Sequence, residues 1–284
     1  MKHYLKLFTV ILLCFSITTC VFANSAENLS DRKIIKQIKK YNKKIKRNNN
    51  SARLYLKRGY LKFCLKDYKS AIEDFTTAQS MAPNNVNIYY LRGRAWYERG
   101  NYQDAMEDFN KAIELKKHDS KLYISRGLLK DKIGEYDSAI DDYTIALKYN
   151  KHSGIAYINR GIAKDKSGKP IASIGDYQRA IKVSKEVAPQ AYYNMGLAQC
   201  KREQYEDAVE NFSKAIELNS IYSDAYYNRG KAYIKLNHLQ YAKFDFEKAV
   251  QYNHQNTQAR EALKNLNEQL DKMYDTTLPD WMLK

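Results

Sequence analysis

Charged residues of opposite sign recur in this chain at one fixed spacing. In five places an aspartate follows an arginine sixteen residues later: Arg58 and Asp74, Arg92 and Asp108, Arg126 and Asp142, Arg160 and Asp176, Arg229 and Asp245. A sixth place in the same register holds Met195 and Asn211, so both charges are lost together. Because a partly buried charge is costly without a partner, this covariation predicts a ladder of five ion pairs between helices. The alternative is that the arginines line a binding surface.

Other residues that could do chemistry are not arranged for it. The histidines after the amino-terminal segment are His118, His152, His238 and His254. They lie near predicted turns, without cysteine or carboxylate ligands at a spacing that holds a metal. Cys64 and Cys200 are predicted to be packing residues. Nucleophile elbows, phosphate loops and HExxH helices are absent. We therefore expect no catalytic site, no metal and no cofactor, and a protein that is not an enzyme.

The elements that must position the ion pairs are repeats. Glycine recurs at intervals of 34, 34, 34, 35 and 34 residues, at Gly59, Gly93, Gly127, Gly161, Gly196 and Gly230. With Ala52 as position 1 of the first repeat, these glycines fall at position 8. Position 4 is always tyrosine, position 24 is always aromatic, position 27 is always alanine, and position 20 is alanine or serine. Small residues let two helices approach and large ones fill the space between them, so each repeat is predicted to be a helical hairpin.

This pattern resembles the tetratricopeptide repeat, and six repeats match it in phase. Two departures are the proline at position 32, found only as Pro83, and the arginine at position 7, where the family is usually apolar. The resemblance implies an all-α protein: a right-handed α-solenoid of six helix-turn-helix units with flanking capping helices. The expected organisation is a signal peptide at 1–23, a basic leader helix at 24–50, six repeats within 51–256 (52–85, 86–119, 120–153, 154–188, 189–222 and 223–256), and a capping helix with a tail at 257–284.

In tetratricopeptide arrays the first helix of each repeat lines a concave groove through positions 2, 5, 9, 12 and 13. The resemblance therefore implies a partner-binding groove that includes Arg53, Tyr60, Phe63, Tyr90, Arg94, Tyr97, Ile124, Leu128, Ile158, Tyr193 and Tyr227. Aromatic and arginine side chains often anchor interfaces, although some of these aromatics could instead pack between helices. Family members that grip a terminal carboxylate carry lysine at position 5, which is never lysine here. We do not expect this chain to bind chaperone tails.

The amino-terminal segment predicts export. Residues 1–23 have a basic start, an apolar run from Leu7 to Ile17, and Val21-Phe22-Ala23 before Asn24, which is typical of a cleaved secretory signal in a bacterial protein. Lipidation at Cys20 is the main alternative, and an uncleaved anchor is a third. A periplasmic or secreted location follows from cleavage.

Basic charge is concentrated in the leader. The chain has a net charge of +16, and between Asn24 and Asn50 nine Lys and Arg face two acidic residues. Ile34, Ile35, Ile38, Tyr41 and Ile45 follow a helical stripe, which predicts a cap over the first repeat. The alternative is a helix that attaches to anionic lipid or polymer. We expect no nucleic-acid partner, because no recognisable reading module is present.

The predicted function is that of a non-enzymatic scaffold that binds a peptide or helix of a protein partner in the groove, and its lysines and arginines favour an acidic partner. Attachment to an anionic surface through the leader is the alternative. The sequence leaves the oligomeric state open.

Overall fold

A computed structural model of the chain describes residues 30–277, and all regular secondary structure in that range is α-helical. The predicted signal peptide, the lipidation candidate Cys20, the start of the leader and residues 278–284 lie outside the described residues. The chain divides between Lys151 and His152 into two compact units, which we call the N-terminal body and the C-terminal body.

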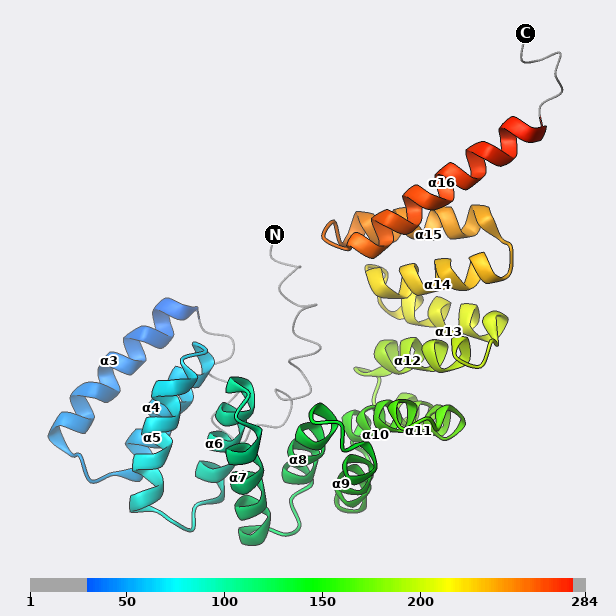
Figure 1. The fold of residues 1–284 in the computed structure, drawn as a ribbon. Helices are drawn as coiled ribbons and strands as arrows, with labels where there is room; N and C mark the ends of the chain where they lie inside the picture. Colours follow the sequence, from blue (N-terminus) through cyan, green and yellow to red (C-terminus); the bar gives the residue numbers. More distant parts are fainter. Residues whose placement is uncertain (1–29, 278–284) are drawn as a thin grey trace. The chain divides into compact units, whose positions relative to one another are not determined.

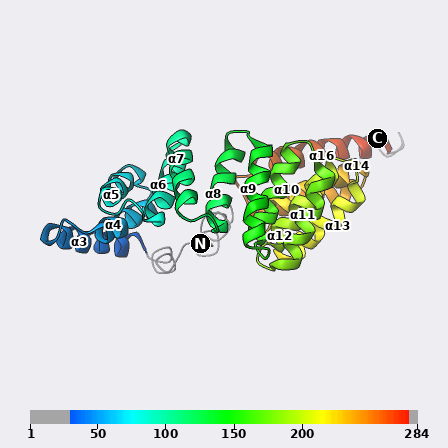
Figure 2. The ribbon, with the colours of Figure 1, turned by 90° about the horizontal axis from the view of Figure 1, so that it is seen from below.

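Each body is a stack of antiparallel helices (Figure 1). The N-terminal body contains α3 (Asp31–Arg47), α4 (Ala52–Cys64), α5 (Tyr68–Met81), α6 (Val86–Arg99), α7 (Tyr102–Leu115), α8 (Ser120–Lys132) and α9 (Tyr136–Tyr149). The C-terminal body contains α10 (Gly154–Lys166), α11 (Pro170–Val183), α12 (Ala188–Cys200), α13 (Tyr205–Leu218), α14 (Ser223–Lys235), α15 (Leu239–Tyr252) and α16 (Thr257–Thr277). Within a body each helix contacts the next, as a second view also shows (Figure 2). The predicted all-α solenoid of helix-turn-helix units is therefore confirmed within each body.

The recurring glycine is required by a neighbouring ring. A Cβ on Gly59 would lie 2.7 Å from Cε1 of Phe75, and one on Gly161 would lie 2.5 Å from Cε1 of Tyr177. Positions 8 and 24 of one repeat are thus in direct contact, and each position-24 ring is at most 2% exposed. Glycine on the first helix lets the ring of the second helix enter the space between them.

All five predicted ion pairs form, each between the two helices of one repeat. The arginine donates from Nη2 to one carboxylate oxygen at 2.6 to 2.7 Å and from Nε to the other at 2.8 to 2.9 Å. The remaining nitrogen, Nη1, binds the preceding element in several places, for example from Arg92 to Thr76 and from Arg126 to Asn110. This bidentate contact fixes the relative orientation of the two side chains as well as pairing their charges.

Position 15 forms the turn inside every repeat with a positive φ angle. Three repeats place glycine there, with φ between 79° and 87° at Gly100, Gly134 and Gly168. The other three place Lys66, Glu203 and Asn237, with φ between 58° and 62°. A residue with a Cβ is disfavoured in this region, so these three turns are strained relative to the glycine turns.

Capping helices lie at both ends of the described chain. On α3, Ile34 and Ile45 are buried, and Ile34 packs with Tyr60 and Leu61 of the first repeat. The capping role expected for the leader is thus confirmed, but Ile35 of the predicted stripe is 44% exposed. At the other end, Leu266 and Leu270 of α16 pack against α15.

Candidate functional site

The first helices of successive repeats share one face of each body. In the N-terminal body α4 contacts α6 and α6 contacts α8, and in the C-terminal body α10 contacts α12 and α12 contacts α14. All eleven predicted groove residues lie on these helices. The face has a separate section in each body.

Five of the eleven predicted residues are buried. They are Tyr60, Tyr90, Arg94, Ile124 and Ile158, each between 4% and 8% exposed. Their side chains fill the spaces between helices, which is the packing role that the sequence left open for the aromatics. They leave little surface for a partner, so only the other six predicted residues remain candidates for partner contact.

In the first two repeats, position 12 carries partly exposed aromatic rings. Phe63 of α4 lies edge-on to Tyr68 with ring centroids 5.4 Å apart, and Tyr97 of α6 lies 5.9 Å from Tyr102. Each pair joins position 12 to position 17 across the turn of one hairpin. The tyrosine at position 17 thus supports each ring, and part of the ring surface stays accessible. Leu128 on α8 is also partly exposed.

The buried Arg94 supports this aromatic surface. Its guanidinium carbon lies 4.9 Å from the ring centroid of Phe63 and 5.7 Å from that of Tyr90. A guanidinium over an aromatic face is an attractive arrangement, and more so when it is desolvated. Arg94 therefore holds Phe63 in place and is not itself an open contact.

In the C-terminal body the predicted aromatics take part in internal contacts. The ring of Tyr193 lies 5.0 Å from Tyr222, and its hydroxyl accepts a hydrogen bond from Nδ2 of Asn228 at 3.1 Å. Burial raises the pKa of the Tyr193 hydroxyl well above its usual value, and the nearby Asp224 raises it further. Tyr227 packs 5.9 Å from Phe246. These two tyrosines serve mainly to pack and bond the helices of their own body.

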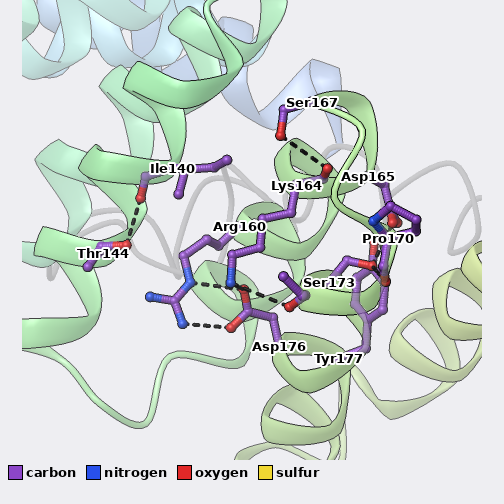
Figure 3. A network of polar contacts seen from close by, with 11 residues as sticks. Ile140, Thr144, Arg160, Lys164, Asp165, Ser167, Pro170, Ser173, Asp176 and Tyr177 are labelled. Carbon is purple, nitrogen blue, oxygen red and sulfur yellow. Dashed lines mark hydrogen bonds and ion pairs between the residues drawn. The ribbon is translucent and has the colours of Figure 1, made fainter.

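Repeat four uses position 12 in a different way (Figure 3). Asp165 accepts hydrogen bonds from the hydroxyls of Tyr177 and Ser173, both at 2.5 Å. Tyr177 is fully buried, and burial followed by the bond to Asp165 raises the pKa of its hydroxyl far above the usual value. In the same repeat Lys164 joins Arg160 on the carboxylate of Asp176, at 2.8 Å from Nζ to oxygen. Asp165, which the repeat pattern places in the groove, is thus bound to the core of its own hairpin.

Sequence reasoning missed this second polar set, although the chain contains its signal. Position 24 is tyrosine only in repeats three and four, and these are also the two repeats with aspartate at position 12, Asp131 and Asp165. The four repeats with phenylalanine at position 24 carry no charge at position 12. This covariation predicts the contact as directly as the arginine and aspartate pattern predicted the ladder.

Arg53, the remaining predicted groove residue, is exposed near the basic helix α3. It is close enough to Lys57 on the same helix for its charge to act on that ammonium, as the charge of Lys44 from α3 also does. The surroundings of Arg53 are therefore cationic and differ from the aromatic surroundings of Phe63 and Tyr97.

Within residues 30–277 no group of three or more His, Cys, Asp and Glu side chains is placed to hold a metal ion. Cys64 and Cys200 are not in disulfides, and both are of intermediate exposure. In the same range no helix combines the length and apolar character needed to cross a membrane.

Comparison with known structures agrees with this architecture. The chain aligns with the Cut9-Hcn1 hetero-tetramer of the APC/C at 15% identity and a TM-score of 0.67, over 86% of this chain and 48% of that one. It therefore spans about half the length of that relative. It aligns with YrrB, described as a TPR protein with an unusual peptide-binding site, at 22% identity and a TM-score of 0.53, over 68% of this chain and 99% of that one. MamA gives 28% identity and a TM-score of 0.53, over 57% of this chain and 94% of that one. No curated protein sequence matches the chain.

The helical hairpins, their close glycine-to-ring contacts and these neighbours place the chain in the class of α-solenoid repeat proteins. Models of the tetratricopeptide repeat match residues 56–120 and 223–256, and a TPR repeat model matches residues 198–237. Residues 56–120 and 198–256 therefore contain tetratricopeptide repeats, and such repeats support a role in protein interaction.

Proposed function

We propose that this protein is a non-enzymatic scaffold that binds a peptide or helix of a protein partner along its first-helix face. The observation that carries the proposal is the row of partly exposed apolar side chains on α4, α6 and α8, with Phe63, Tyr97 and Leu128 at its centre. YrrB, with the same fold, has a peptide-binding site. An amphipathic helix or an extended peptide suits an apolar face of this kind.

Phe63 and Tyr97 are the strongest contact candidates in this face. Each ring is held on one side by a tyrosine of the following helix, so little side-chain entropy remains to be lost on binding. Rigid aromatic anchors typically contribute most of the affinity of an interface. The buried groove residues support these anchors and do not compete with them for the partner.

The test compares captured proteins between two double variants of the full chain. Phe63→Ala/Tyr97→Ala removes the proposed anchors. Tyr241→Ala/Phe244→Ala is the matched control, because it removes two aromatic side chains that are 63% and 52% exposed on the second helix α15. A captured protein is identified, purified and titrated against all three chains.

We expect the anchor variant to bind that partner at least about 30-fold more weakly, as loss of two anchoring side chains implies. The control should bind like the wild type. Circular dichroism and thermal unfolding confirm that both variants are folded. Equal binding by the anchor variant, or selective loss in the control, contradicts the proposal.

A further inference from the structure

The helix α3 carries a dense and uncompensated positive charge. Its cations are Arg32, Lys33, Lys36, Lys39, Lys40, Lys43, Lys44, Lys46 and Arg47, and all nine are exposed. Asp31 is its one acidic residue. Within residues 30–277 none of the nine takes part in an ion pair that the structure shows, whereas the position-7 arginines are paired with aspartate. The position-7 arginines are neutralised within their repeats, but α3 presents its charges to solvent.

These cations form a continuous face. At about 100° per residue, all nine fall within an arc of about 160° around the helix axis, along a length of about 25 Å. The buried Ile34 and Ile45 lie outside this arc, and Ile34 packs on the first repeat. Asn42, also outside the arc, accepts a hydrogen bond from Nη1 of Arg58 at 2.8 Å. The contacts on the apolar side therefore fix which side of α3 points outward.

The first repeat extends the positive region. Arg53 is exposed on α4, and Lys57 lies one turn further along the same helix. Burial lowers the pKa of the Lys57 ammonium, and the positive charges of Arg53 and Lys44 lower it further. Cations of two helices are thus close enough to repel one another, and nearby anions would relieve this repulsion.

We propose that this basic face docks the protein peripherally on an anionic phospholipid bilayer. A broad array of cations on a rigid helix matches a planar surface of headgroup charges, to which each Lys or Arg is attracted. A single-stranded nucleic acid is disfavoured, because its binding sites combine a basic groove with stacked aromatic rings. Tyr41, the one aromatic residue of α3, lies on the apolar side and is partly buried.

The structure also limits how α3 would contact the bilayer. Ile34 and Ile38, which an interfacial helix would insert between lipids, pack on the first repeat instead. Ile45 is buried, which leaves Ile35 as the one exposed isoleucine of α3. Attachment is therefore electrostatic and strongly weakened by salt. It is independent of the proposed peptide face, so either activity can fail without the other.

The experiment measures partition of the full chain onto vesicles. One set contains phosphatidylcholine with about one third phosphatidylglycerol, and the other contains phosphatidylcholine alone, each at about 0.05 M and about 0.5 M salt. The neutral set accounts for any contact made by the apolar segment Leu7–Ile17, which does not require anionic lipid. We expect binding that requires phosphatidylglycerol and is largely lost at the higher salt.

Three variants locate the contact. Lys36, Lys39, Lys40 and Lys43 are each changed to Gln in one variant and to Arg in a second. The control changes the exposed Lys148, Lys151, Lys182 and Lys185 to Gln, with the same loss of net charge. At about fivefold per cation, the α3 Gln variant should bind several hundredfold more weakly. The Arg variant should keep its binding, and the control should change little.

Several results would overturn the proposal. They are equal binding to neutral vesicles, equal losses in the α3 and control Gln variants, or loss of binding in the Arg variant. Binding to soluble dextran sulfate without binding to anionic vesicles would also overturn it, because a free polyanion would then be the occupant. Unchanged helicity by circular dichroism excludes unfolding as the cause of any loss.

Discussion

Repeats four and five have the same hairpin structure, but the interior of repeat four contains charged side chains and that of repeat five contains none. At positions 7, 11, 12, 20, 23 and 24, repeat four holds Arg160, Lys164, Asp165, Ser173, Asp176 and Tyr177. At the same positions repeat five holds Met195, Gln199, Cys200, Ala208, Asn211 and Phe212. In both repeats the glycine at position 8 still contacts the ring at position 24. A Cβ on Gly161 would lie 2.5 Å from that ring, and one on Gly196 would lie 2.7 Å from it. All six side chains differ while the backbone contact is kept.

The residues that set the spacing of the two helices are therefore different from the polar residues that lie between them. Glycine, alanine and the aromatic ring set the distance between the two helices in both repeats. The Arg–Asp pair at positions 7 and 23 and the Asp–Tyr pair at positions 12 and 24 are each present or absent as a set. One member alone would be a buried polar group without a partner. Asn211 of repeat five bonds Gln199 at 2.8 Å, which replaces the ion pair by a neutral contact.

The largest expected effect comes from removing one member of an Arg–Asp pair and leaving the other in place. In repeat two, position 11 is Trp96, so Asp108 has no lysine partner from that position. Arg92→Met should lower the free energy of opening of α6 and α7 by about 3–5 kcal/mol, because a buried carboxylate loses its partner. Hydrogen exchange of these two helices measures the change.

Repeat five and repeat four supply the controls. Adding Asp108→Asn to Arg92→Met reproduces the neutral combination of repeat five and should recover most of the loss. Arg160→Met should cost less, because Lys164 still pairs with Asp176. An equal cost in both repeats, or no recovery in the double variant, would show that the residues do not act as a set.

A smaller effect is expected from the set around position 12. Asp165→Cys leaves the buried hydroxyl of Tyr177 without its acceptor, whereas Ser173 keeps the carbonyl oxygen of Pro170 at 2.8 Å. This loss should destabilise α10 and α11 by about 1–3 kcal/mol. Adding Tyr177→Phe and Ser173→Ala completes the combination of repeat five and should restore most of the stability. Hydrogen exchange again gives the local values, and a triple variant as unstable as the single one would refute the argument.

The smallest effect concerns the turn at position 15, where repeat four has Gly168 and repeat five has Glu203. Glu203→Gly should stabilise α12 and α13 by about 0.5–1 kcal/mol, since relief of the positive φ exceeds the added flexibility of the unfolded chain. Asn237→Gly should gain less, because asparagine tolerates this conformation better. A shift in thermal midpoint measures both, and destabilisation by Glu203→Gly would contradict the strain.

The fold was largely predictable because its main determinants repeat in phase. A fixed glycine, alanines and rings gave six hairpins, and the paired loss of Arg and Asp gave the ion-pair ladder, which the structure confirms. The covariation of positions 12 and 24 is equally readable in the sequence, but the family pattern places position 12 in the groove and so gives no reason to expect Asp131 and Asp165 inside their hairpins. The turn at position 15 was missed for a different reason: Lys66 and Glu203 give no sign of a positive φ.

The groove was harder to predict than the fold. Family positions indicate which helix face a residue occupies but not how deeply its side chain is buried. Tyr60, Tyr90 and Ile124 lie on the predicted helices, yet packing between neighbouring helices covers them. Phe63 and Tyr97 lie near the ends of α4 and α6 and keep open surface, although Tyr68 and Arg94 contact Phe63 and Tyr102 contacts Tyr97.

The most direct test of the scaffold proposal is site-specific photo-crosslinking to the partner. A benzoylphenylalanine replaces Tyr97 on the first helix α6 in one chain, and Glu107 on the second helix α7 of the same repeat in another. Both positions have accessible surface. The account predicts a crosslink to the partner from position 97 and none from position 107. Crosslinking from position 107 alone would contradict binding along the first-helix face.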